Sequence, residues 1–328
     1  MSRDLTPTER LFPYCRLPGF AWNGEVAEPS EERYIDPSEF GNDDGYPVAP
    51  GVFCAAFAAC SWAADAVNGS ATVEFPSGKL HLKAYLWKAV GPRAFPAVLF
   101  NHGSGGATAD QTAWMPITQA ATVLAPFFVK HGYAFFYPFR RGHGPSASQA
   151  PYMQDVLRRE EETKGKEARQ HLQFVLLTTD HLEDVMAALA FLKTVPGIDA
   201  QRIAVAGHSF GGQLALLAAE RDKTIRAAVT FGAAANSWER SPELRERLTN
   251  AVRLTNAAIM LTHAENDFGT SAGRALSEEL DRLHKPHALK IYPPVGLTSD
   301  DGHGMLYENI PAWESDVFEF LDRQVKGQ

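Results

Sequence analysis

Short hydrophobic runs alternate with longer amphipathic stretches over most of this chain, from about residue 71 to its end. The short runs are rich in β-branched and aromatic residues and predict strands, whereas the longer stretches have helical spacing. Alternation of this kind predicts an α/β fold, with a mostly parallel central sheet covered by helices on both faces. Strands are expected at 71–75, 80–87, 96–101, 133–137, 203–207, 227–231, 257–262 and 288–292. Helices are expected up to 130 and over 151–195, 211–220, 272–283 and 313–325.

The first two expected strands flank a Pro-Ser-Gly turn at 76–78, which predicts a hairpin. Residues 1–70 lack a comparable pattern and are rich in Pro, Gly, Asp and Glu, so we interpret them as an N-terminal extension to one α/β domain over 71–328. Within that domain, the highly charged part of 151–195 is interpreted as a solvated helix face.

The alanine-rich segment 51–66 has an apolar centre and ends in an Ala-x-Ala pattern, as a secretory signal does. It begins about fifty residues into the chain and has no basic stretch directly before it, so it would act as a signal only from an internal translation start. A cytoplasmic protein is the expectation as numbered, and a periplasmic or secreted one is the alternative. The other interpretation of the segment is a helix packed on the core.

The composition restricts the classes of partner that this chain is expected to bind. A hydrophobic content of 45% supports a substantial core, and a net charge of −8 argues against broad attraction to nucleic acid or to anionic membranes. No run approaches the roughly 20 apolar residues of a spanning helix. Three cysteines cannot all pair within one chain, and all precede residue 71. A small-molecule substrate is expected, and the sequence leaves the oligomeric state open.

The segment Gly207-His-Ser-Phe-Gly-Gly212 lies between a predicted strand and a predicted helix. A serine on such a sharp turn needs small residues two positions away on either side, and Gly207 and Gly211 meet that need. The turn also directs backbone N–H groups at the start of the helix toward any negative charge beside Ser209. Ser209 is therefore the candidate nucleophile, with the amide of Phe210 as one oxyanion donor.

A nucleophilic serine needs a general base, and in this architecture the order along the chain is serine, acid, histidine. Of the histidines after Ser209, His303 follows the last predicted strand and is the candidate base. Asp267 follows the strand that ends near 262 and is the candidate acid, with Glu265 as the alternative. The competing interpretation of Asp267 is a helix cap or turn residue.

The loop after the 96–101 strand is glycine-rich, and the amide of Ser104, or alternatively of Gly103, is the candidate second oxyanion donor. His102, Arg140 and Arg141 are on the same predicted rim and are candidate substrate ligands, the arginines for a substrate carboxylate. Ion pairs that shape the loop are the alternative role for the arginines. His102 and His143 have no metal-site spacing, so no metal is expected.

These segments, with Arg140-Arg-Gly-His-Gly144 and Asp301-Gly-His-Gly304, resemble the dienelactone hydrolase and prolyl-oligopeptidase-like branch of the α/β-hydrolase superfamily. The resemblance covers about residue 71 to the C-terminus. It departs from dienelactone hydrolases proper, which use cysteine where this chain has Ser209, and the upstream residues are too few for the propeller of prolyl oligopeptidases.

The resemblance implies an α/β-hydrolase fold with a helical, lid-like insertion at about 145–180 that roofs an acyl pocket. It implies two-step acyl transfer in which Ser209 attacks, His303 takes the proton and Asp267 orients the imidazole, with no cofactor. A small-ester hydrolase is expected, a serine peptidase or amidase is the alternative, and a non-catalytic binding module is the third possibility.

Overall fold

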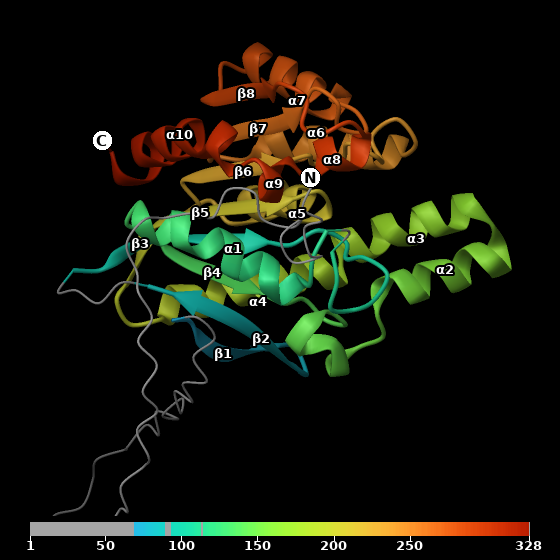
Figure 1. The fold of residues 1–328 in the computed structure, drawn as a ribbon, viewed down its shortest axis with the longest axis horizontal. Helices are drawn as coiled ribbons and strands as arrows, with labels where there is room; N and C mark the ends of the chain where they lie inside the picture. Colours follow the sequence, from blue (N-terminus) through green and yellow to red (C-terminus); the bar gives the residue numbers. More distant parts are fainter. Residues whose placement is uncertain (1–68, 89–92, 113, 328) are drawn as a thin grey trace, which may run out of the picture. The chain divides into compact units, whose positions relative to one another are not determined.

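The computed structural model describes residues 69–88, 93–112 and 114–327 (Figure 1). The signal-like segment and the remainder of the N-terminal extension before residue 69 lie outside these residues. Among the described residues, none of the helices has both the length and the apolar character needed to cross a bilayer.

One eight-stranded sheet organises the described part of the chain, in the order β1-β2-β4-β3-β5-β6-β7-β8. β1 pairs antiparallel with β2 and β2 antiparallel with β4, which confirms the predicted hairpin, and all later neighbours are parallel. The strands are β1 (Ala71–Ser77), β2 (Leu80–Trp87), β3 (Phe95–Asn101), β4 (Ala134–Pro138), β5 (Ile198–His208), β6 (Ala227–Phe231), β7 (Ala258–Ala264) and β8 (His287–Tyr292).

Two hydrophobic layers cover the sheet, one on each face. The first contains buried side chains of α4 (Asp180–Thr194), α5 (Phe210–Arg221), α6 (Pro242–Leu254) and α7 (Ser271–Arg282). The second contains those of α1 (Ile117–Lys130), α9 (Met305–Glu308) and α10 (Ile310–Leu321). A short helix, α8 (Ser299–His303), leads into α9, and a π-helical turn at Asp322–Lys326 follows α10. The predicted fold class, an α/β-hydrolase with helices on both faces, is confirmed.

The stretch 151–195, expected to be one helical segment, is broken twice. After a 3-10 turn at Gly144–Gln149, it forms α2 (Met153–Lys164), α3 (Lys166–Thr178) and α4. Gly165 separates the first two with a φ of 91°, a conformation that costs glycine little. As a result, α2 and α3 lie side by side as a helical hairpin, at the right of Figure 1, and do not form one long helix with α4.

The direction of the parallel strands determines where the site lies. Because β3 to β8 run in the same direction, the loops that follow them lie at one edge of the sheet, where α/β proteins form their binding crevices. Those loops carry the chemistry-bearing motifs of the sequence.

Candidate active site

Ser209 lies on the turn between β5 and α5, with φ 53° and ψ −116°. Positive φ is unfavourable for a residue with a side chain, and here it is maintained by close packing on both sides. A Cβ on Gly207 would overlap the carbonyl of Gly211, and one on Gly211 would overlap the carbonyl of Asn101. The two glycines therefore allow the strained serine turn, as the sequence analysis expected.

Asp267 lies in the loop after β7, and His303 is the last residue of α8, after β8. The Nδ1–H of His303 donates to Asp267 Oδ1 over 2.7 Å, and both side chains are at least nine-tenths buried. Gly232, after β6, packs against the pair with φ +60°, and a Cβ there would lie 2.9 Å from both Asp267 Oδ2 and His303 Nδ1. Glu265, the alternative acid, is exposed, and its backbone N–H donates to the carbonyl of Tyr292.

Asp267 also binds a second histidine, which the sequence analysis did not anticipate. His263 Nδ1–H donates to Asp267 Oδ2 over 3.0 Å, and the backbone N–H of Phe268 donates to Oδ1 over 2.7 Å. Burial by itself would raise the pKa of Asp267, but the hydrogen bonds from His263 and His303 outweigh it and lower the pKa below its usual range. The carboxylate therefore stays ionised between two imidazoles.

The residue before the serine supports the histidine loop. His208 Nε2–H donates to the backbone carbonyl of His303 over 2.9 Å, and the two rings lie 4.7 Å apart. Burial lowers the pKa of His208 to about 3, so its ring is a neutral donor at ordinary pH. Trp114 and Phe268 pack against His303, with ring centroids 5.9 Å and 5.0 Å away.

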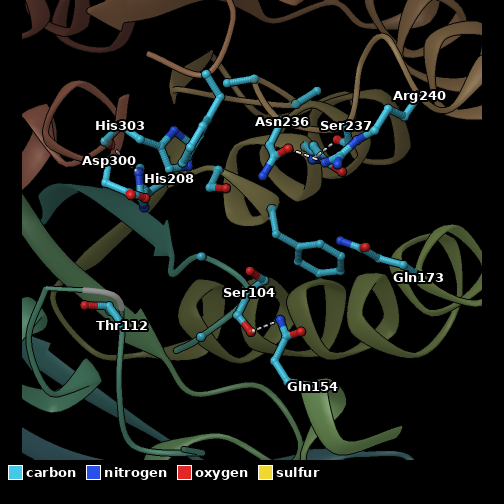
Figure 2. Close-up of a pocket in the computed structure, with 18 of the residues that line it drawn as sticks. Ser104, Thr112, Gln154, Gln173, His208, Asn236, Ser237, Arg240, Asp300 and His303 are labelled. Atoms are coloured by element: carbon cyan, nitrogen blue, oxygen red, sulfur yellow. Dashed lines mark hydrogen bonds between the residues drawn. The ribbon is translucent and has the colours of Figure 1, made fainter. Parts of the chain in front are cut away.

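Ser209, Phe210 and Ser104 line one cavity together with His303 (Figure 2). Phe210 is the first residue of α5, where backbone N–H groups have no partner within the helix. The carbonyl of Ser104 accepts from Gln154 Nε2 over 3.1 Å, which ties this loop to α2. This arrangement is compatible with the expected pair of oxyanion amides.

The basic residues proposed as substrate ligands are placed elsewhere. None of His102, Arg140 and Arg141 is among the described residues that line the cavity. Arg140 is 1% exposed and donates to the carbonyls of His102, over 2.8 Å, and Gly103, over 2.6 Å, so it holds the oxyanion loop from behind.

Arg141 makes a two-pronged contact with the buried carboxylate of Asp184 in α4 and an ion pair with Asp180 over 2.9 Å. This is the loop-shaping ion pair that the sequence analysis held as the alternative. His102 is fully buried, and burial together with the Arg140 charge lowers its pKa well below its usual range. Its Nδ1–H donates to the Gly103 carbonyl over 2.8 Å.

The cavity has a volume of about 340 Å³, and much of its wall is polar. Figure 2 shows His303, Asp300 and His208 on one side and Arg240 and Gln173 on the other. Besides Thr112 and Asp300, the polar wall residues that the sequence analysis missed come from α2, α3, α5 and the segment after β6, namely Gln154, Arg169, Gln173, Gln213, Asn236, Ser237 and Arg240. No local motif marks them, because only the packing of these elements brings them to Ser209.

Comparison with known proteins gives the family and the fold of this chain. The model of the dienelactone hydrolase family matches residues 84–304, which is more than half of the chain. A curated relative, the quorum-quenching protein AidA of Acinetobacter baumannii, is 28% identical over 158 residues, or 48% of this chain. The match spans 42% of that relative's length.

Solved structures share the fold at low identity. The Pyrococcus horikoshii acylaminoacyl peptidase has a TM-score of 0.56 at 17% identity, covering 79% of this chain and 42% of that one. A putative dienelactone hydrolase from Klebsiella pneumoniae has a TM-score of 0.56 at 15% identity, covering 79% and 98%. Est1E from Butyrivibrio proteoclasticus, solved with ferulic acid, has a TM-score of 0.54 at 17% identity, covering 77% and 99%.

Proposed function

As the chain belongs to the dienelactone hydrolase family and is a hydrolase of the α/β-hydrolase fold, we propose that it cleaves a small carboxylic ester through a serine acyl-enzyme. The observation that carries the proposal is the 2.7 Å hydrogen bond from His303 to Asp267, because His303 and the strained Ser209 line the same cavity. A neutral imidazole fixed by a buried carboxylate is the base that a serine nucleophile requires.

The mechanism has two steps. Asp267 holds the proton of His303 on Nδ1, so that Nε2 is left to take the proton of Ser209 as its Oγ attacks the ester carbonyl. The amides of Phe210 and Ser104 stabilise the oxyanion, and His303 then returns the proton to the leaving alcohol. A water molecule activated by His303 releases the acyl group in the same way.

Arg140 and His208 serve this chemistry as positioning residues. Arg140 fixes the carbonyls that precede the Ser104 amide, and His208 fixes the backbone carbonyl of His303. Neither has to touch the substrate for its loss to lower turnover, because misplaced donors stabilise an oxyanion poorly.

The hairpin of α2 and α3 falls within the insertion expected at about 145–180, and we propose that it is the lid of the cavity. Gln154 from α2 and Arg169 and Gln173 from α3 contribute to the cavity wall. Exchanging the insertion should therefore alter substrate preference more than stability; equal preference across an ester series would contradict this role.

The test uses a fluorophosphonate probe and 4-nitrophenyl acetate on the purified protein. Ser209→Ala should lose both labelling and hydrolysis, the latter by several orders of magnitude, while the exposed Ser271→Ala at the start of α7 keeps them. Labelling that persists in Ser209→Ala would refute the nucleophile. Absence of labelling in both proteins would favour a non-catalytic binding role.

Amide hydrolysis is the second candidate, since the acylaminoacyl peptidase has the same fold. It uses the same serine, so the discriminating measurement is the ratio of kcat/KM for a 4-nitrophenyl ester and the matched 4-nitroanilide. An anilide rate near the ester rate would favour the amidase.

A further inference from the structure

A second, smaller chamber of about 60 Å³ lies between α3 and α6, next to the cavity beside Ser209. The two chambers share part of their wall, so they adjoin. The shared residues are Arg169, Gln173, Gln213, Ser237 and Arg240. The two chambers therefore meet at a polar boundary.

Hydrogen-bond donors dominate that boundary. Arg169 is paired with Glu161 over 3.1 Å, whereas Arg240 contacts the side-chain oxygen of Asn236 and has no carboxylate partner among the described residues. Gln213 is 5% exposed, and its Nε2 makes only a long 3.4 Å contact with Ser237 Oγ. Arginine carries five N–H groups and no acceptor, so Arg240 has donors to offer to an oxygen atom of a ligand.

Beyond this boundary the far chamber is lined by three apolar residues and by the uncharged Gln170 and Ser241. Leu177 is 1% and Leu244 4% exposed, and Phe174 completes the apolar side of the wall. A volume of 60 Å³ corresponds to about four to six water-sized probes, which is room for a short alkyl group. A charged terminus placed there would lose its hydration without gaining an oppositely charged partner among the described residues that line the chamber beyond the boundary.

We propose that the acyl part of the substrate has two sections, one polar and one apolar; this inference rests on the proposed function. An amide carbonyl within the acyl chain accepts from Arg240, with Gln173 and Gln213 beside it, and a short alkyl tip occupies the chamber of Phe174, Leu177 and Leu244. Arg240 is exposed and can return to water, but a plain alkyl chain would leave the buried amide of Gln213 without a good partner, and sites built to hydrogen-bond a substrate discriminate against analogues that lack the polar group.

The test compares two series of 4-nitrophenyl esters. One contains N-acyl-β-alanine esters with acyl tails from acetyl to decanoyl, and the other contains alkanoates of equal chain length, in which two methylenes replace the amide. We expect kcat/KM for the amide series to exceed that of the alkanoates by about tenfold or more and to peak at short tails. Equal values in the two series, or a higher value for a hemiglutarate ester with a terminal carboxylate, would overturn the proposal.

Single substitutions test which residues cause the preference for the amide series. Arg240→Met should reduce the ratio of amide to alkanoate kcat/KM by about tenfold, whereas Arg323→Met, on the π-helical turn away from both cavities, should not change it. Phe174→Ala should move the optimum to longer tails and Leu244→Phe to shorter ones, each with a thermal melt to verify folding. An unchanged ratio in Arg240→Met would overturn the subsite.

The failure of the subsite and the failure of the proposed function are distinguishable. Hydrolysis of 4-nitrophenyl acetate with fluorophosphonate labelling, but no preference for the amide series, refutes only the subsite. Absence of both hydrolysis and labelling in the unmodified protein overturns the serine hydrolase and, with it, the two-section substrate.

Discussion

Replacing Asp267 by Asn tests the two-histidine arrangement around this residue. In a serine triad whose acid contacts one histidine, this change lets the new amide donate to the imidazole and trap the wrong tautomer, which lowers kcat by roughly 10⁴. Here Asp267 Oδ1 accepts from both His303, over 2.7 Å, and the backbone of Phe268, over 2.7 Å, while Oδ2 accepts from His263. The Asn oxygen should stay at the Oδ1 position, because the flipped amide would set two N–H groups against each other at the Phe268 backbone.

With the oxygen there, the new NH2 group faces His263, which can accept by moving its proton to Nε2. His303 then keeps its proton on Nδ1, and the loss is that of a charged acceptor replaced by a neutral one. Hydrogen bonds to charged groups contribute about 1.5–3 kcal/mol, and each 1.4 kcal/mol is tenfold. Asp267→Asn should therefore lower kcat by about ten- to a hundredfold, well short of the loss expected when the tautomer is trapped.

The assay is the initial rate of 4-nitrophenyl acetate hydrolysis at saturating substrate for the unmodified protein, Asp267→Asn and Asp267→Ala. Asp267→Ala removes the acceptor altogether, so its kcat should fall by orders of magnitude more than that of Asp267→Asn. Equal rates for the two variants, within a factor of three, would show that the amide has flipped and would refute the reasoning from Oδ1.

Three other changes test the surroundings of the site. His263→Leu leaves one buried carboxylate oxygen of Asp267 unpaired and should lower the free energy of unfolding, measured by urea titration, by about 1.5–3 kcal/mol. His263→Asn keeps a donor at the Nδ1 position and should recover part of the lost free energy, so equal urea midpoints for the two variants would contradict this role. Arg140→Met removes donors from the carbonyls of His102 and Gly103 and should lower kcat more than it raises KM, with an unchanged kcat opposing the positioning role. Burial, followed by the Arg140 charge, lowers the pKa of His143 to about 4, so the unfolded chain binds more protons than the folded one below about pH 6.5. The free energy of unfolding should therefore fall as the pH drops from about 6.5 to 4, and His143→Gln should reduce this dependence by up to about 1.4 kcal/mol per pH unit. The same pH dependence in the variant and in the unmodified protein would refute this.

Local sequence determined the elements and the serine turn. Alternating runs of apolar residues predicted all eight strands to within a few residues, except that β5 begins at Ile198 rather than near 203. The Gly-x-Ser-x-Gly spacing is also a local demand, because Gly207 and Gly211 meet atoms in adjoining elements that any strand-to-helix turn of this kind brings close. The order serine, acid, histidine, together with the position of each residue after a predicted strand, indicated His303 and favoured Asp267 over Glu265. In the structure, His303 Nδ1 lies 2.7 Å from Asp267 Oδ1.

Tertiary structure decided which polar groups reach the cavity. The sequence left open whether Arg140 and Arg141 bind the substrate or shape the loop, and packing decides it by burying Arg140 under the oxyanion loop and pairing Arg141 with Asp184. Arg240, in a segment without any motif, reaches the cavity instead. Periodicity reports whether a side chain faces the core, but the partner of a buried charge depends on contacts between residues far apart in the chain, and those exist only once the helices have packed on the sheet.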